Sequence, residues 1–142
     1  MSRKPFETSV AELTQSLGLL IRRVRAATDN HELSLTESMV LARLDQQGPL
    51  TTAELARIES MKPQSMGATV GALEEAGLVQ RTPHPTDGRQ LLVSLTTKGA
   101  EMRRAFKDAK RSWIANAISQ LDKQEQETLF AAGEILRRLA EQ

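Results

Sequence analysis

The sequence predicts a mainly α-helical protein with one small β-hairpin. Two observations support this fold class. Apolar residues recur at intervals of three and four along most of the 142 residues, as they do in helices that bury one face. Between residues 78 and 95, in contrast, two short runs rich in Leu and Val flank a stretch with prolines and an Asp-Gly dipeptide, which favours a hairpin.

The first two helices are predicted from their capping residues. The first is expected over residues 9–29, where Ser9 and Glu12 form a capping-box pair. The second follows the same pairing of Ser34 with Glu37, and a Gly-Pro dipeptide ends it. The apolar positions of the first helix are Val10, Leu13, Leu17, Leu20, Ile21 and Val24.

Residues 51–77 are expected to form a helix, a tight turn and a second helix. Thr51 pairs with Glu54 to open the short first helix. Pro63 stands where the first turn of the second helix tolerates proline, and Gly77 is a typical stop for that helix. The buried face of the short helix is expected to be Leu55, Ala56 and Ile58.

The hairpin comes next, from β-prone runs at residues 78–82 and 91–95. Thr97 is expected to cap the long helix behind it, and Asp122 paired with Glu125 to cap the last helix. The apolar positions of these two helices are Met102, Phe106, Trp113, Ile114, Ala117, Ile118, Leu129, Ala132, Leu136 and Leu139.

A helix-turn-helix followed at once by a hairpin is a winged-helix arrangement. In such proteins the second helix enters the major groove of DNA, and the hairpin, or wing, reaches the neighbouring minor groove or its phosphates. Arg89 at the wing tip would then contact DNA. Asp87 would orient its guanidinium through a charge-assisted hydrogen bond, and Gly88 would allow the backbone turn. Asp-Gly is also a common turn dipeptide, so the tip could be only a turn.

The first helix and the last two carry more apolar side chains than one small core can cover. A two-fold dimer would bury them, with recognition helices about 34–36 Å apart and a pseudo-palindromic operator. The alternative is a monomer in which these helices fold back onto the core. The residues expected at the dimer interface are Leu13, Leu17, Leu20, Leu136 and Leu139.

The sequence also resembles the MarR family of bacterial transcriptional regulators. The run DGRQLLVSLTTKG, residues 87–99, is similar to the family's wing signature, in which Asp and then Arg precede an apolar strand that ends in Leu-Thr, with Gly three residues beyond. The stretch LTTAELARIESMKPQSMGATVGALEEAGLVQR, residues 50–81, is similar to the family's helix-turn-helix. The resemblance covers essentially the full length.

The resemblance implies one domain over residues 1–142, with a winged helix-turn-helix at residues 34–96 between dimerisation helices at residues 1–30 and 97–142. It implies a homodimeric repressor of transcription whose recognition helix spans residues 63–77. The implied contacts are Gln64, Ser65 and Thr69 at base edges, Thr52, Lys62 and Arg81 at phosphates, and Asp87 with Arg89 at the wing. Each of these could instead be ordinary solvated surface.

The recognition helix departs from the family pattern. Many members carry Arg or Lys where this chain has Ala68 or Ala72. Sequence specificity is therefore expected to rely more on the wing and on DNA shape. The resemblance also implies release from DNA by a small aromatic or phenolic ligand, with Arg22, Met39 and Trp113 as candidate contacts, although Trp113 on an apolar stripe is also typical of a core residue.

Composition narrows the possible functions. The formal net charge is only +1, so overall charge does not identify a DNA-binding protein. The chain has no Cys, which excludes thiolate catalysis and Cys-ligated zinc, and it has none of the common catalytic or phosphate-loop motifs. We therefore expect neither an enzyme nor a cofactor, and a cytoplasmic location because no signal peptide or membrane span is present. The alternative function is a dimeric winged-helix docking module without specific DNA binding.

Overall fold

The computed structural model describes residues 3–28 and 33–142, which form two compact units. Unit 1 comprises the chain up to residue 29 and from residue 108 onward, and unit 2 comprises residues 30–107. The predicted end of the first helix at residue 29, and the predicted end of the first dimerisation segment at residue 30, fall outside the described residues. No helix in the described residues is long and apolar enough to cross a membrane.

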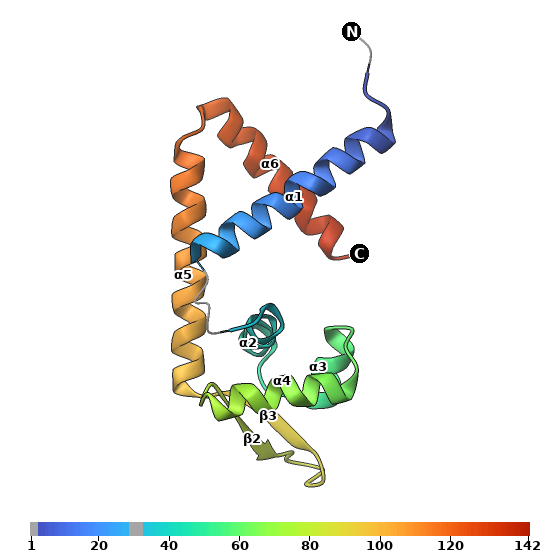
Figure 1. Ribbon diagram of the computed structural model, residues 1–142, viewed down its shortest axis with the longest axis vertical. Helices are drawn as coiled ribbons and strands as arrows, with labels where there is room; N and C mark the ends of the chain where they lie inside the picture. Colours follow the sequence, from blue (N-terminus) through green and yellow to red (C-terminus); the bar gives the residue numbers. More distant parts are fainter. Residues whose placement is uncertain (1–2, 29–32) are drawn as a thin grey trace. The chain divides into compact units, whose positions relative to one another are not determined.

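The predicted fold class, mainly α-helical with a small β-hairpin wing, is confirmed. The chain forms a winged helix-turn-helix with further helices on either side of it in the sequence (Figure 1). The elements are α1 (Phe6–Thr28), α2 (Leu35–Gln47), β1 (Leu50–Thr51), α3 (Thr52–Ile58), α4 (Pro63–Glu75), β2 (Val79–Pro83), β3 (Leu91–Leu95), α5 (Thr97–Ser119) and α6 (Lys123–Ala140).

The wing belongs to a three-stranded antiparallel sheet in the order β1-β3-β2. Strand β2 starts and ends one residue later than predicted, so that Pro83 pairs with Leu91 at the outer end of the hairpin. Proline is tolerated there because β2 is an edge strand. Strand β1, which pairs Leu50 with Val93, is absent from the prediction because two residues show no alternation of apolar and polar side chains.

Three predicted capping boxes are present, at the starts of α2, α3 and α6. In α2, Ser34 Oγ accepts a hydrogen bond from the Glu37 N–H at 3.1 Å, and the Ser34 N–H donates to the Glu37 carboxylate at 3.0 Å. In α3, hydrogen bonds from Thr51 lower the pKa of the Glu54 carboxyl group below its usual value. This lowered pKa stabilises the fold when the carboxylate is ionised, and the contribution is lost as the pH falls through it.

The predicted start of the first helix is wrong. Helix α1 begins at Phe6, and Ser9 lies inside it, where its N–H donates to the Pro5 carbonyl at 3.1 Å. Glu12 therefore has no capping role, and its carboxylate accepts a hydrogen bond from Lys4 Nζ at 2.8 Å instead. The helix can start early because Pro5 still supplies a carbonyl acceptor, although it has no N–H to donate.

The predicted cap of the long helix is wrong by one residue. Helix α5 does begin at Thr97, but Thr96 is the residue whose Oγ1 accepts the Gly99 N–H, at 3.0 Å. The same hydroxyl donates to the Gly77 carbonyl at 2.6 Å. Thr96 and Thr97 are adjacent, so the sequence offered two possible caps. The threonine that caps the helix, Thr96, is the one that also contacts Gly77, 19 positions away in the sequence.

The core of unit 2 gathers apolar side chains from α2, α3, α4 and the sheet. Leu55 and Ala56 are buried as predicted, and Ile58 packs on the edge of the core. Burying one such Leu stabilises the fold by about 1.5–3 kcal/mol. The fully buried side chains are Val40, Leu41, Leu55, Met66, Val70, Leu73, Leu78, Val79 and Val93.

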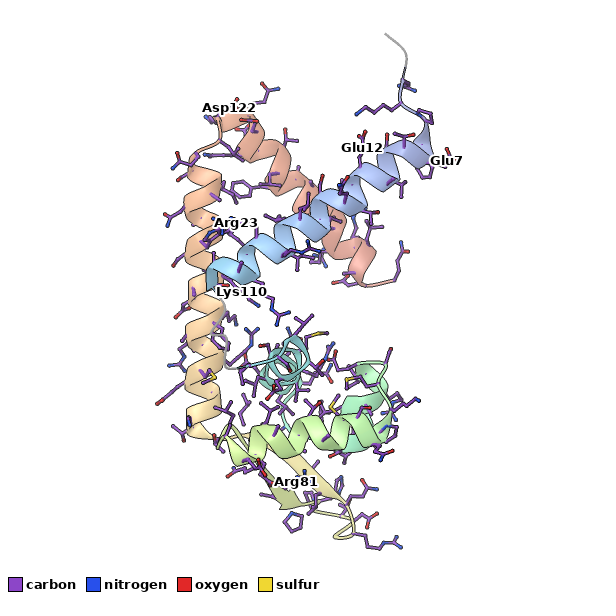
Figure 2. All side chains as sticks on the ribbon, in the orientation of Figure 1. Glu7, Glu12, Arg23, Arg81, Lys110 and Asp122 are labelled. Carbon is purple, nitrogen blue, oxygen red and sulfur yellow. The ribbon has the colours of Figure 1, made fainter. Side chains whose placement is uncertain are left out.

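Unit 1 leaves many apolar side chains exposed. Val24 is the one buried residue among the described positions of α1, and no residue of α6 is buried. The guanidinium of Arg23, which is labelled in Figure 2, lies over the ring of Trp113 within this unit, 5.5 Å from the ring centroid. Large exposed apolar side chains on α1 and α6 are Phe6, Val10, Leu13, Leu19, Leu20, Ile21, Leu129, Phe130, Ile135 and Leu139.

Candidate nucleic-acid interface

Helix α4 is fixed to unit 2 by one face. Its Met66, Val70 and Leu73 side chains are fully buried in the core. Pro63 occupies the first turn, as predicted, and Lys62 stands just before it with an exposed side chain that makes no capping hydrogen bond. The packing of these three side chains therefore fixes α4 to the core of unit 2. The opposite face of the helix, with Lys62 at its N-terminal end, is open to solvent.

The outer face of α4 consists of Gln64, Ser65, Ala68 and Ala72, all of them exposed. Three of the predicted contact residues lie here or beside it. Gln64 and Ser65 are on the face itself, whereas Thr69 is half-buried at its flank. The Thr69 hydroxyl donates to the Ser65 carbonyl at 3.1 Å, so it remains available chiefly as a hydrogen-bond acceptor.

The glycines of α4 do not serve packing within the chain. A Cβ atom added to Gly67 or Gly71 would meet no atom within 4 Å. Neither glycine has a positive φ. Neither glycine is therefore required by a close approach of another backbone among the described residues, and both leave this part of the helix surface without a side chain.

The predicted contact between Asp87 and Arg89 is confirmed. Asp87 Oδ1 accepts hydrogen bonds from the Arg89 N–H at 3.2 Å and from Arg89 Nε at 3.3 Å. Gln90 Nε2 donates to the other carboxylate oxygen at 3.3 Å. The Arg89 side chain is 93% exposed. Asp87 thus holds the base of the guanidinium while the rest of the group faces solvent at the tip of the wing.

The role predicted for Gly88 is wrong. The Gln90 N–H donates to the Asp87 carbonyl at 3.0 Å, so residues 87–90 form a tight turn. Gly88 has no positive φ in this turn, and a Cβ atom there would meet nothing within 4 Å. Most residues can therefore occupy this position, as in the common type of turn that uses only negative φ values.

Arg81 is more constrained than the other predicted phosphate ligands. Its Nε lies 3.6 Å from a carboxylate oxygen of Glu74, is buried, and makes no hydrogen bond to the described residues. Arg81 lies on the hairpin next to α4 (Figure 2). Thr52, the third predicted phosphate ligand, is half-buried in the first turn of α3. A phosphate contact by Arg81 would have to compete with Glu74.

Two residues near the wing, Lys98 and His84, are not among the predicted DNA contacts. Lys98 Nζ donates to the Ala76 carbonyl at 3.0 Å and so places a cation at the C-terminal end of α4. His84 accepts hydrogen bonds from the wing backbone. No sequence signal could have found the Lys98 contact, because its partner lies 22 positions away.

The remaining candidates lie in different units. Arg22 is exposed on α1 and Trp113 is half-buried on α5, both in unit 1, whereas Met39 is exposed on α2 in unit 2. The predicted interface leucines all belong to unit 1, and Leu13, Leu20 and Leu139 are 50–55% exposed. No group of three or more His, Asp or Glu side chains that could bind a metal ion occurs among the described residues.

Relatives of known class align with most of the chain. Residues 33–91 match the model of the MarR family. The chain is 32% identical to the HTH-type transcriptional regulator MT0903.1 of Mycobacterium tuberculosis over 132 residues, 93% of this chain and 92% of that protein. It is 34% identical to the HTH-type transcriptional repressor Rv2887 of the same species, over 77% of this chain and 79% of that protein.

Solved structures share the fold. Rv1404 from Mycobacterium tuberculosis superposes with a TM-score of 0.88 at 24% identity, covering 99% of this chain and 97% of that one. The PcaV transcriptional regulator from Streptomyces coelicolor, solved in complex with its natural ligand, has a TM-score of 0.67 at 20% identity and covers 99% and 98% of the two chains. The winged-helix arrangement therefore recurs in these proteins.

Proposed function

Because the chain belongs to the MarR family of transcriptional regulators, we propose that it is a cytoplasmic homodimeric repressor that binds a pseudo-palindromic operator in double-stranded DNA. The observation that carries this proposal is the wing tip, where Asp87 holds an almost fully exposed Arg89. A solvated arginine held by a neighbouring carboxylate is typical of a group that binds phosphate or a groove edge. One relative is named a transcriptional repressor, which supports repression rather than activation of transcription.

In this proposal α4 enters the major groove. Gln64 can pair with adenine through two hydrogen bonds, and Ser65 can contact either a base or the backbone. The half-buried Thr69 contributes an acceptor at the flank. Phosphates are bound by Lys62, Thr52 and Arg81. Arg89 binds the adjacent minor groove or its phosphates. Phosphate contacts of this kind position the helix on the DNA, whereas contacts to bases read the sequence.

We assign dimerisation to the helices at residues 1–30 and 97–142, and DNA binding to residues 34–96. The apolar side chains exposed on α1 and α6 support a partner, because a soluble monomer rarely leaves such an extended apolar surface open. A second copy of the chain is the simplest partner, since a two-fold dimer presents two wings and two recognition helices. The operator half-sites would then lie about 34–36 Å apart.

Replacing Arg89 by Ala is expected to weaken binding to the operator about tenfold or more and to reduce the salt dependence by about one phosphate contact. The folding transition should not change, because Arg89 is exposed and contacts only the wing tip. Fluorescence anisotropy would follow binding to the DNA upstream of the protein's own gene, with unrelated DNA of equal length for comparison.

Gly88→Ala is the matched control for this variant, because its Cβ meets open space and its backbone conformation suits any residue. It should bind DNA like the unmodified protein. Equal affinity of Arg89→Ala and the unmodified protein would contradict the role of the wing.

A protein-docking function is the second candidate, and one observation favours it. The outer face of α4 carries no cation, and Glu74 and Glu75 follow it at the end of the helix. The same titration distinguishes the two functions. Salt-dependent binding that prefers the upstream fragment supports the regulator, whereas equal and weak binding to both DNAs supports docking.

We also propose that a small aromatic carboxylate or phenol releases the protein from DNA. Arg22 could pair with a carboxylate and Trp113 could stack on a ring, and both residues belong to unit 1. Unit 1 also contains a groove of about 610 Å³ lined mainly by apolar side chains of α5 and α6, with Arg111 and Phe130 at its wall. Its volume lies within the range of small-molecule sites.

Benzoate and phenol are the probes for this effector class. Either should change the fluorescence of Trp113, the one tryptophan of the chain, and lower the affinity for the upstream DNA. Arg22→Ala should weaken the response to benzoate. Acetate at the same ionic strength is the control for salt. Unchanged DNA affinity at saturating benzoate and phenol would contradict the proposal, because a ligand acts only through unequal binding to the two states.

A further inference from the structure

The imidazole of His84 is an acceptor for the backbone of the wing. Its Nδ1 atom accepts hydrogen bonds from the N–H groups of Thr86 and Asp87, each at 3.2 Å. The Thr86 hydroxyl lies 3.1 Å from the same nitrogen. At the other side of the loop, the His84 N–H donates to the Gln90 carbonyl at 2.9 Å. His84 thus contacts both sides of the wing tip.

These contacts specify the protonation of the ring. A backbone N–H can only donate, so a nitrogen that faces two of them must present a lone pair. Nδ1 is therefore unprotonated, and the neutral ring carries its proton on Nε2. An Nδ1–H tautomer or an imidazolium would place a third hydrogen against the two amide hydrogens and break both bonds. Among the charged groups around His84, Asp87 donates its N–H to the ring and holds Arg89 through its carboxylate, and Glu54 of α3 interacts with His84 electrostatically.

The His84 contacts lead directly to the predicted DNA contact. His84 holds the Asp87 amide, and the Asp87 carboxylate in turn holds Arg89. We propose that His84 is the positioning residue of the wing, which in its neutral Nε2–H form fixes Asp87 and, through it, the Arg89 guanidinium for binding to DNA. This inference rests on the proposed function for its last step, but its first step concerns the free protein alone.

Affinity for the upstream DNA tests the last step. His84→Ala should weaken binding severalfold, up to about tenfold, because the loss of hydrogen bonds of this kind changes an equilibrium constant by about that factor. His84→Asn should retain most of the affinity, since the amide oxygen can take the place of Nδ1. In an Arg89→Ala background, His84→Ala should have no further effect, because its action passes through Arg89.

The first step is tested without DNA. Nitrogen NMR of the imidazole at about pH 8, where free imidazoles are neutral, should show an acceptor nitrogen at Nδ1 and a proton on Nε2. Amide hydrogen exchange at Thr86 and Asp87 should be slow in the unmodified protein and in His84→Asn, and faster in His84→Ala. A thermal melt of each variant checks that unit 2 stays folded.

The outcomes separate this inference from the proposed function. If the unmodified protein shows no preferential, salt-dependent DNA binding, the proposed function fails, and NMR and exchange alone decide the role of His84 in the wing. The positioning role is overturned if the unmodified protein binds DNA and His84→Ala binds it equally well. It is also overturned if His84→Ala reduces the affinity of the Arg89→Ala variant as much as that of the unmodified protein. A proton on Nδ1 at about pH 8 would overturn the assigned tautomer.

Discussion

Gly99→Ala should destabilise the folded protein by at least about 3 kcal/mol, the largest stability change expected from a single methyl group in this chain. A Cβ atom at Gly99 would overlap the Leu78 carbonyl oxygen and would lie 2.9 Å from its carbonyl carbon. Both are backbone atoms, so no side chain can move aside to relieve the clash.

The contacts around Gly99 prevent the backbone from moving away. The Thr96 N–H donates to the Leu78 carbonyl at 3.1 Å, and Lys98 Nζ donates to the Ala76 carbonyl at 3.0 Å. The first turn of α5 is thus attached to the segment that connects α4 with the wing. Moving α5 outward to admit a methyl group would break these hydrogen bonds or the packing of Leu78, which is 1% exposed.

Urea unfolding followed by circular dichroism would measure this effect. The matched control is Gly71→Ala in the same unit, where a Cβ atom meets nothing within 4 Å. That substitution should stabilise α4 by about 0.5–1 kcal/mol, because alanine is the better helix former. An unfolding free energy for Gly99→Ala equal to that of the unmodified protein would contradict the close contact with Leu78.

The second large effect is expected at the proposed dimer interface. Introducing Asp at both Leu13 and Leu20 should convert the dimer into monomers, because two charges would be buried against an apolar partner surface without a counterion. These leucines are 52% and 50% exposed in the single chain, so the fold of the chain itself should tolerate the change. Sedimentation velocity would show the oligomeric state.

The affinity for the operator should also decrease when the dimer dissociates. A monomer engages one half-site, and losing the linked second half-site reduces affinity at least about a hundredfold. Gln15→Asp is the control, because this exposed residue lies on the opposite side of α1 and adds a charge of the same sign. A Leu13→Asp, Leu20→Asp protein that sediments as a dimer would show that α1 does not form the interface.

Features that depend on neighbouring residues could be predicted from the sequence. The capping pair of Ser34 with Glu37 and the contact of Asp87 with Arg89 join residues two or three positions apart, so local chemistry determines them. The same reasoning explains the order of the helices and the hairpin. It failed at Ser9, where the capping motif is present but the helix extends one turn further toward the N-terminus.

Features that depend on distant residues were decided only by the tertiary structure. Strand β1 exists because Val93 provides its partner, and Thr96 is held by Gly77. Gly99 is required by the Leu78 backbone, which approaches from 21 positions away. The reason is physical: capping and turn preferences act within about one helical turn, whereas close packing is determined by whichever segments the core brings together. Sequence alone therefore determined the helices, the hairpin and the charged wing tip, whereas packing determined strand β1 and the residues that hold the wing against the helices.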